Sequence, residues 1–563
     1  MALKLFRNTE FADSSQYGVV QQRLASHPFT VAILASLWLA GAGNLALWRA
    51  LTRLPELDNW RGLAFAIGFA LMIASVICAL LALLSWRWTF KPAVTLFLFA
   101  AAAGAHYMLA YGIVIDTTMM VNVLQTDMRE TRELLGWQLL LTLVVLAVLP
   151  CVWLWRHPLR RVPVLRAMWQ NAALFAGSCL LLVALLFAVF QDFASLMRNQ
   201  LQLRYLINPL NAFYALAEIA AQPLQRTAAP PLPIGQDSRL GASHARSPKP
   251  PLLVLVLGET ARSVNFGING YARVTTPKLA GERLASWRNA WSCGTSTAAS
   301  VPCMFSHLGR VAYEARDSDY FSLLDVLQQA GLGVLWLDNQ SGCKGLCDRV
   351  ASANTRSLSH PTLCTGGECL DEIMLDGLDA RIAALDPQRR ARGVVLVLHQ
   401  MGSHGPAYFK RSPPAFKRFR PECGSNALQD CSREQVLNAY DNTILYTDHF
   451  LHGVITWLKA REASNTTAML YVSDHGESLG ENNLYLHGLP YAIAPDVQKQ
   501  VPWITWFSSG FEQRRGIGLP CVQARADERV SHDNFFHSVL GLMDVQAKVY
   551  QSALDPYAAC YKS

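Results

Sequence analysis

Five long apolar stretches dominate the first two hundred residues of the chain. They cover residues 29–50, 63–85, 92–115, 137–155 and 171–191. A helix needs about 20 residues to cross the hydrocarbon core of a bilayer. Buried helices of soluble proteins rarely run so long, and so close together, with so few charges. The pattern therefore predicts a membrane domain of five spanning helices over residues 1–191.

The second half of the chain has a different pattern of apolar and polar residues. Short apolar runs alternate with stretches of helical pattern, which predicts a mostly parallel α/β sheet in a domain covering residues 251–563. The predicted strands are Leu252–Leu257, Gly333–Leu337, Val394–Leu398, Ala468–Val472 and Val501–Phe507, and the predicted helices are 321–331, 368–385, 434–461 and 532–543. Functional groups of such sheets gather at the carboxyl ends of the strands.

Residues 192–250 connect the two parts. Residues 192–225 have an amphipathic helical pattern, which fits a helix on the membrane surface or a connector that packs on the second domain. Residues 226–250 are rich in Pro, Ser and Gly, so we expect an extended linker there.

Composition and charge give the predicted orientation. Hydrophobic residues make up 52% of the chain and charged residues 16%. Basic residues concentrate before the first stretch and in the second and fourth connections, whereas the third connection carries Asp116, Asp127, Glu130 and Glu133. The positive-inside rule then predicts a cytoplasmic N-terminus and a second domain outside the cytoplasm. We expect no cleavable signal peptide, because the first apolar run is a full span.

The cysteines agree with an oxidising compartment. Three of the 13 lie in predicted spans and the other ten follow residue 290. Their close spacing favours five disulfides, namely Cys293–Cys303, Cys343–Cys347, Cys364–Cys369, Cys423–Cys431 and Cys521–Cys560. A zinc site on Cys343, Cys347, Cys364 and Cys369 is the alternative, but it lacks the usual C-x-x-C spacing.

Polar, reactive residues follow the predicted strands. Glu259 follows the first, and Asp474 with His475 follows the fourth. Carboxylate oxygen and imidazole nitrogen are ligands suited to zinc, and three protein ligands with one open position are typical of a catalytic zinc site. Residues 292–303 supply hydroxyls that could act as the nucleophile, and the local sequence does not choose among Thr295, Ser296, Thr297 and Ser300.

Other polar residues could contact an anionic substrate. His404 and His487 follow strand ends, and Lys344 near Ser341 is a plausible phosphate contact. His399, His532 and His537 have no assigned role. A transporter or membrane sensor is disfavoured, because the predicted spans lack scattered intramembrane charges; His106 is the main exception.

These motifs together resemble a known family. Residues 258–260, the Ser/Thr-rich segment 293–303, residues 403–406 and residues 474–478 with His487 resemble the lipid A phosphoethanolamine transferases, which include the mobile colistin-resistance enzymes. The resemblance covers essentially the whole chain. It implies five spans before an alkaline-phosphatase-like domain.

The resemblance also implies roles for residues. It places zinc ligands at Glu259, Thr297, Asp474 and His475, with Thr297 as the nucleophile. Substrate-phosphate contacts or ligands of a second zinc fall on Lys344, His404 and His487, with Ser341 near them. A lipid-binding stretch in the third connection falls on Asn122, Thr126 and Glu130, which would share one face of a helix at a spacing of four.

The implied reaction takes place at a membrane. Phosphoethanolamine would move from phosphatidylethanolamine to a lipid A phosphate through a covalent Thr297 intermediate, which releases diacylglycerol and weakens the binding of polymyxins. The implied location is a Gram-negative inner membrane with a periplasmic catalytic domain, no nucleic-acid partner and a monomeric state. Alternatives are transfer to a core sugar of lipopolysaccharide, a sulfatase, or a membrane-anchored phosphodiesterase or glycerophosphotransferase.

Overall fold

A computed structural model describes residues 25–126, 128–225 and 230–562, without the side chains of residues 56, 128–130 and 222–225. The chain forms two compact units. The first contains the residues up to Leu109 together with Gly136–Ala215, and the second contains Ala110–Leu135 and the residues from Leu216 onward. The connection between the third and fourth apolar helices therefore belongs to the unit that carries the sheet.

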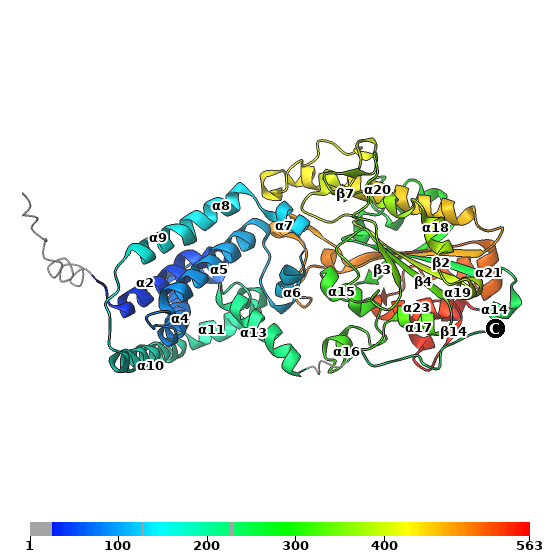
Figure 1. Cartoon of the computed structure of the whole chain (residues 1–563). Coiled ribbons are helices and arrows are strands. Elements are labelled where there is room, and N and C mark those ends of the chain that lie inside the picture. The colour runs from blue at the N-terminus through cyan, green and yellow to red at the C-terminus, as the bar shows by residue number, and fades with distance from the viewer. Residues whose placement is uncertain (1–24, 127, 226–229, 563) are drawn as a thin grey trace, which may run out of the picture. The chain divides into compact units, whose positions relative to one another are not determined.

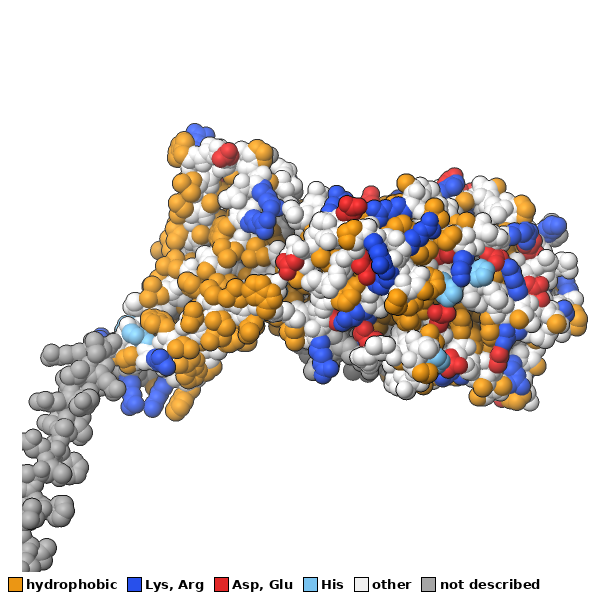
Figure 2. All heavy atoms as spheres, turned by 90° about the horizontal axis from the view of Figure 1, so that it is seen from above, with side chains coloured by type: hydrophobic (Ala, Val, Ile, Leu, Met, Phe, Trp, Pro, Cys, Tyr) orange, Lys and Arg blue, Asp and Glu red, His pale blue; other side chains and the backbone are white. Residues whose placement is uncertain are grey.

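The five predicted apolar helices are confirmed. Each is long and apolar enough to cross a membrane, and hydrophobic side chains cover the visible face of this unit, whereas charged side chains are spread over the other unit (Figure 2). The helices are Pro28–Leu51, formed by α2 (Pro28–Gly41) and α3 (Leu45–Leu51), then α4 (Trp60–Leu83), α5 (Phe90–Tyr111), Trp137–Arg156, formed largely by α8 (Trp137–Leu143) and α9 (Leu149–Arg156), and α10 (Val164–Ala188).

The segment after the last span is helical, as its pattern predicted, but it is divided into several helices. Residues 192–225 form three helices, α11 (Phe190–Asn199), α12 (Leu201–Arg204) and α13 (Leu210–Gln225). The predicted linker is also partly structured, because β1 (Arg239–Leu240) pairs with β14 (Val545–Gln546). Helix α14 (Ser243–Arg246) follows β1. A Pro-rich composition thus did not exclude strand pairing.

An eight-stranded, mostly parallel sheet forms the centre of the second unit (Figure 1). Strand β12 is antiparallel to both of its neighbours, β3 and β9, while the other pairings are parallel. In spatial order the strands are β13 (Val530–Ser531), β3 (Leu284–Trp291), β12 (Gln500–Phe507), β9 (Thr466–Ser473), β2 (Pro251–Gly258), β8 (Val394–His399), β4 (Gly333–Asp338) and β5 (Ala351–Asn354). The five predicted strands correspond to β2, β4, β8, β9 and β12.

Helices cover both faces of this sheet. Alternate residues of β2 enter opposite cores, since successive side chains of a strand point to opposite faces. Leu253 packs with α17 (Leu323–Gln329) and α23 (Phe535–Leu542), whereas Val254 packs with α18 (Leu378–Ala383) and α20 (Arg433–Lys459). A capping box begins α20, in which Ser432 and Gln435 satisfy one another's backbone N–H groups.

One predicted helix is wrong. Residues 368–385 do not form a single helix, because they contain β7 (Glu368–Cys369), a 3₁₀ turn at Asp371–Met374 and then α18. Gly377 before α18 has a left-handed backbone with φ of 64°, and such a residue interrupts a right-handed helix. Disulfide bonding of Cys369 to Cys364 also holds β7 against β6 (Cys364–Thr365).

All five predicted disulfides are confirmed. The structure joins Cys293 to Cys303, Cys343 to Cys347, Cys364 to Cys369, Cys423 to Cys431 and Cys521 to Cys560. The remaining cysteines, Cys78, Cys151 and Cys179, are free. The alternative zinc site is therefore wrong, because its four cysteines are oxidised in two disulfides.

Candidate metal centre and nucleophile

Strand register brings the two candidate carboxylates together. Strands β2 and β9 are parallel neighbours, and Gly258 pairs with Ser473 as their last residues. Glu259 and Asp474 therefore leave the same edge of the sheet side by side, and the Asp474 N–H donates to Gly258 O at 2.9 Å. The meeting of residues 215 positions apart follows from the parallel pairing alone.

Glu259, Asp474 and His475 form one compact cluster. Their candidate ligand atoms all lie within 4.8 Å of one another, and all three residues are 0% exposed. His475 Nε2 lies 3.4 Å from both Glu259 Oε1 and Asp474 Oδ2. His475 Nδ1 lies 2.9 Å from Gly476 O. An Nδ1–H donor to that carbonyl leaves Nε2 on the side of the carboxylates, where it could serve as a metal ligand together with them.

The electrostatics of this cluster fit a bound cation. Burial raises the pKa of Asp474 to about 6, with a further contribution from Glu259. Burial opposes ionisation of His475 as well, but the charges of Asp474 and Glu259 outweigh it and raise the pKa of His475 to about 10. Asp474 Oδ2 has no hydrogen-bond partner among the described residues. Buried carboxylates are costly unless a cation accompanies them, so these residues fit a zinc ion.

The backbone beside Glu259 is strained. Thr260 has a φ of 59°, which is rare for a β-branched residue. Its N–H donates to Asp474 Oδ1 at 3.1 Å and its hydroxyl donates to Glu259 Oε1 at 2.6 Å. These contacts hold both carboxylates in place, and strain of this kind is typical of functional sites.

The four candidate hydroxyls differ in what they contact. Thr297, the first residue of α15 (Thr297–Met304), places Oγ1 3.0 Å from Glu259 Oε2 and 3.5 Å from His475 Nε2. Thr295 instead donates to Leu489 O, and Ser300 to Asp474 O. Ser296 Oγ has no hydrogen-bond partner among the described residues. Thr297 is therefore the hydroxyl of these four that lies beside the candidate ligand atoms of Glu259 and His475.

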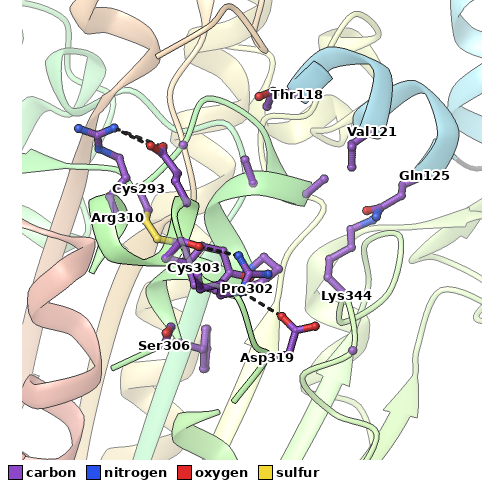
Figure 3. A pocket seen from close by; sticks show the side chains of 18 of the residues that line it. Thr118, Val121, Gln125, Cys293, Pro302, Cys303, Ser306, Arg310, Asp319 and Lys344 are labelled. Atoms are coloured by element: carbon purple, nitrogen blue, oxygen red, sulfur yellow. Dashed lines mark hydrogen bonds and ion pairs between the residues drawn. A yellow bond between two sulfur atoms is a disulfide. The ribbon is translucent and has the colours of Figure 1, made fainter. Parts of the chain in front are cut away.

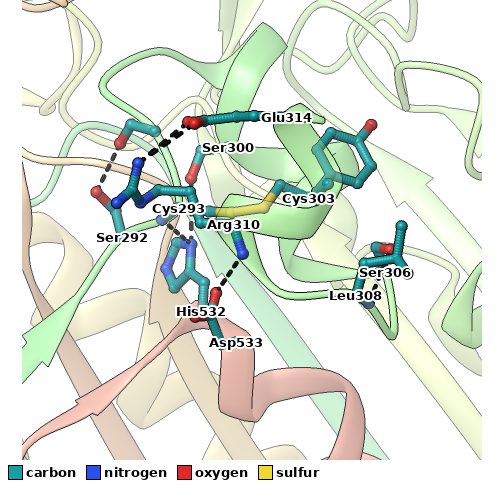
Figure 4. Close-up of a disulfide and its surroundings, with 12 residues drawn as sticks. Ser292, Cys293, Ser300, Cys303, Ser306, Leu308, Arg310, Glu314, His532 and Asp533 are labelled. Carbon is teal, nitrogen blue, oxygen red and sulfur yellow. Dashed lines mark hydrogen bonds and ion pairs between the residues drawn. A yellow bond between two sulfur atoms is a disulfide. The ribbon is translucent and has the colours of Figure 1, made fainter. Parts of the chain in front are cut away.

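His532 supports the loop that carries Thr297. Its Nδ1 accepts from Cys293 N at 3.1 Å (Figure 4), and its Nε2 lies 3.0 Å from Ser473 O. Ser300 Oγ lies 3.1 Å from the same Nδ1. Burial lowers the pKa of His532 to about 3, so the ring is neutral at physiological pH and links the loop to the end of β9.

His404, His487 and Glu477 lie beside the cluster. The His487 ring centroid is 4.2 Å from that of His475 and 5.9 Å from that of His404. Glu477 Oε2 lies 3.4 Å from His487 Nδ1. Burial lowers the pKa of His487 well below its usual value and raises the pKa of Glu477 well above its usual value.

Ser341 and Lys344 belong to the loop after β4. Lys344 Nζ donates to Ser341 Oγ at 3.0 Å. Ser341 lines a small pocket together with His404. Lys344 lines a much larger cavity of about 1010 Å³ (Figure 3). The pair thus lies between the cavity and the histidine.

Helix α6 (Thr117–Gln125) and α15 both line this cavity. Thr118, Val121 and Gln125 line it from α6 (Figure 3). The predicted lipid-binding positions Asn122 and Thr126 are half-buried, while the Glu130 side chain lies outside the described residues.

The three lipid-binding positions do not share one helix. The helix ends at Gln125, because Thr126 has an extended backbone and its hydroxyl donates to Asn122 O at 2.8 Å. A hydroxyl of this kind competes with the helical hydrogen bonds. A second helix, α7 (Met128–Leu134), begins beyond this break.

Two ionisable side chains near the site were not predicted from the sequence. Glu477 lies in the same motif as Asp474, and its position two residues after His475 was the available signal. Arg411 has no motif around it, yet its Nε donates to His404 O at 3.0 Å. Only the folded chain brings this arginine to the site.

Comparisons with known proteins agree with this fold. The family described as "Sulfatase" matches residues 251–545, and the family described as "Phosphoethanolamine transferase EptA/EptB" matches residues 73–224. Phosphoethanolamine transferase EptA of Escherichia coli K12 is 39% identical over 539 residues, which covers 94% of this chain and 96% of that protein.

Phosphatidylethanolamine transferase Mcr-1 of Escherichia coli is 35% identical over 548 residues, covering 94% of this chain and 98% of Mcr-1. The solved structure of integral membrane lipooligosaccharide phosphoethanolamine transferase A (EptA) from Neisseria meningitidis matches with a TM-score of 0.90 and 35% identity, covering 95% of this chain and 99% of that one. The similarity extends through the apolar helices and the sheet. This chain therefore belongs to the EptA family of phosphoethanolamine transferases.

Proposed function

We propose that this protein transfers phosphoethanolamine from phosphatidylethanolamine to a phosphate group of lipid A. The observation that supports this most is the Thr297 hydroxyl 3.0 Å from Glu259 Oε2 in a buried cluster of candidate metal ligands. The names of the relatives point to phosphoethanolamine as the transferred group. The sulfatase match reflects the shared α/β domain, and no feature of this site favours a sulfate ester over a phosphodiester.

Glu259, Asp474, His475 and Thr297 would hold one zinc ion. A bound zinc would lower the pKa of the Thr297 hydroxyl and polarise a phosphoryl oxygen. Thr297 Oγ1 would then give up its proton and attack the phosphorus of phosphatidylethanolamine, and the bond to the diacylglycerol oxygen would break as a proton is delivered to that oxygen, so that protons balance over the step. Thr297 would carry the phosphoethanolamine as a covalent ester.

The second half of the reaction returns Thr297 to its starting state. A lipid A phosphate oxygen would attack the same phosphorus, and the bond to Oγ1 would break as the hydroxyl regains a proton. His404, His487 and Lys344 would neutralise phosphate charge or move that proton. A second zinc at His404 and His487 is the alternative use of these rings.

The remaining residues would position the lipids. Asn122, Thr126 and Glu130 would contact lipid from the segment before the fourth span, and the large cavity beside Lys344 has room for a sugar headgroup. We further propose a cytoplasmic N-terminus and a periplasmic catalytic unit. Basic residues concentrate before the first span and in the second and fourth connections, and such segments stay in the cytoplasm by the positive-inside rule. Residues 1–191 would form the membrane domain, apart from the connection 110–135, which belongs to the unit with the sheet, and residues 251–563 would form the catalytic domain.

One experiment tests the central step. Purified protein in nanodiscs is incubated with fluorescent phosphatidylethanolamine, and intact-mass and peptide mass spectrometry locate any adduct. We expect diacylglycerol release and a phosphoethanolamine ester on Thr297, both abolished in Thr297→Ala. Ser296→Ala removes the neighbouring hydroxyl and is the matched control. Undiminished release from Thr297→Ala would refute the mechanism.

A further inference from the structure

Arg411 makes three polar contacts in three different parts of the catalytic unit. Its side chain is only 4% exposed. Nε donates to His404 O at 3.0 Å, one terminal nitrogen donates to Glu368 Oε2 at 2.7 Å, and the other donates to Glu133 Oε2 at 2.5 Å. The planar fork of an arginine can serve three acceptors at fixed angles, which a lysine cannot do.

Glu133 fixes the membrane-proximal helix α7 to this arginine. Its side chain is 5% exposed and its Oε1 accepts from Lys410 Nζ at 3.0 Å. Its backbone carbonyl accepts from Asn426 Nδ2 at 2.8 Å. A carboxylate buried between two cations is costly to separate from either of them, so α7 is held firmly against the loop that contains Arg411.

The contact to His404 links this ion pair to the reaction. Arg411 and His404 line the same small pocket as Ser341. The Arg411 guanidinium donates to the backbone carbonyl of His404, so this contact acts on the segment that carries the imidazole. Glu368, which accepts from the same arginine, lies on β7. The Cys364–Cys369 disulfide joins β7 to its neighbour β6.

We propose that Arg411 is a positioning residue that joins α7 to the His404 loop, so that a lipid held by α7 and the phosphate contact at His404 keep a fixed separation. This proposal rests on the proposed function, which assigns the phosphate contact to His404 and the lipid contact to the segment before the fourth span. Glu133 is the lipid-side anchor of the joint.

The test uses the full-length protein in nanodiscs of phosphatidylethanolamine and phosphatidylglycerol. The variants are Arg411→Met, Arg411→Lys, Glu133→Gln and Glu368→Gln. Arg288→Met is the control, because Arg288 also forms a two-pronged ion pair, with Asp527, but on an exposed surface. The measurements are kcat, KM for phosphatidylethanolamine, zinc content and amide hydrogen exchange.

Arg411→Met should lower kcat by about 10- to 100-fold, because small displacements of a contact group have effects of that size. Zinc content should stay at the wild-type level. Arg411→Lys should recover part of kcat. Glu133→Gln should raise KM more than it lowers kcat, because it frees α7 while the Arg411 bond to His404 O remains. Arg288→Met should leave all four quantities unchanged.

Amide hydrogen exchange distinguishes a residue that couples two segments from an ion pair that only stabilises the fold. Arg411→Met should accelerate exchange in residues 401–407 and 128–134 together. A folded, zinc-loaded Arg411→Met with kcat within twofold of wild type would overturn the proposal, as would faster exchange in only one segment.

Two controls keep the result interpretable. If Arg411→Met does not fold, Glu133→Gln and Glu368→Gln decide, and unchanged KM, kcat and exchange in both would overturn the proposal. If the wild-type protein transfers no phosphoethanolamine, the proposed function fails, and the exchange comparison still tests the joint itself.

Discussion

Thr297 Oγ1 lies 3.0 Å from Glu259 Oε2, although 38 residues separate the two along the chain. Glu259 reaches this point because it follows the last residue of β2, and Thr297 because it begins α15. The Cys293–Cys303 disulfide closes the segment that contains Thr297. The contact therefore depends on the sheet edge and on a covalently closed loop.

Replacement of Asp474 by Asn should remove the metal. The buried Asp474 Oδ2 has no hydrogen-bond partner among the described residues, and an amide is a poor substitute for a carboxylate ligand of zinc. Zinc at 100 times its Kd stabilises the folded state by about 2.7 kcal/mol. We therefore expect a chelator to lower the Tm of the wild type in detergent but not that of Asp474→Asn.

Elemental analysis should give one zinc per wild-type chain and much less in the variant. The matched control is Asp379→Asn, because Asp379 is an exposed carboxylate paired with Arg461. An Asp474→Asn protein that keeps its zinc and its sensitivity to chelator would contradict the assignment of Asp474 as a ligand.

Replacement of His532 by Ala should reduce both stability and activity. The fully buried ring forms hydrogen bonds with Cys293 N and Ser473 O. Each buried backbone group left without a partner costs about 1–3 kcal/mol. The loop carrying Thr297 also loses its support, so kcat should fall by about 100-fold. His532→Gln should lose less, because its amide can still donate to Ser473 O; equal losses in both variants would argue against this role.

The fold was largely predictable from local patterns. The strand ending at Leu257 and the strand ending at Val472 are uniformly apolar, and buried strands in α/β proteins have this pattern. The broken helix at 368–385 was not predictable in the same way, because the left-handed backbone of Gly377 interrupts it and a hydrophobic pattern does not report backbone conformation. The ordered pairing of β1 with β14 joins residues about 300 positions apart, which a local window cannot detect.

The site was predictable only where its residues lie in short motifs. Glu259, Asp474 and His475 follow strand ends, so sequence position alone indicated a metal site. The choice of Thr297 over its neighbouring hydroxyls needed either the family resemblance or the three-dimensional contact. Arg411 and Glu133 are 278 residues apart, and neither carries a local signal.

Asp448 should make the stability of the catalytic unit depend on pH. Burial raises the pKa of Asp448 to about 6, despite hydrogen bonds from the Leu279 and Lys278 N–H groups. Since the folded pKa exceeds the unfolded value, the folded state binds the proton more tightly. This contribution is fully present below about pH 4 and is lost as pH rises through 6, a change of about 3 kcal/mol.

Asp448→Asn should abolish that part of the pH dependence. Between pH 4 and 7, the unfolding free energy of the wild type should therefore fall relative to that of the variant. Denaturant unfolding in detergent measures this difference. Asp379→Asn again serves as the exposed control. A difference that stays constant over this range would show that Asp448 titrates normally.

Two disulfides of the catalytic unit should have separable effects on stability and activity. Cys293–Cys303 spans 10 residues and Cys521–Cys560 spans 39. Loop-closure entropy assigns about 3 kcal/mol to the shorter loop and about 4 kcal/mol to the longer one. Double Cys→Ala substitution at 521 and 560 should therefore lower stability more, and leave kcat of the folded enzyme near wild type.

The Cys293→Ala, Cys303→Ala variant should show the reverse order. Its loss of stability should be smaller, yet kcat should fall, because the closed segment carries Thr297 and the His532 contact at Cys293 N. Denaturant unfolding and diacylglycerol release, measured on the same preparations, separate the two effects. If both double variants lost activity only in proportion to the unfolded fraction, the disulfide would stabilise the fold without positioning the nucleophile.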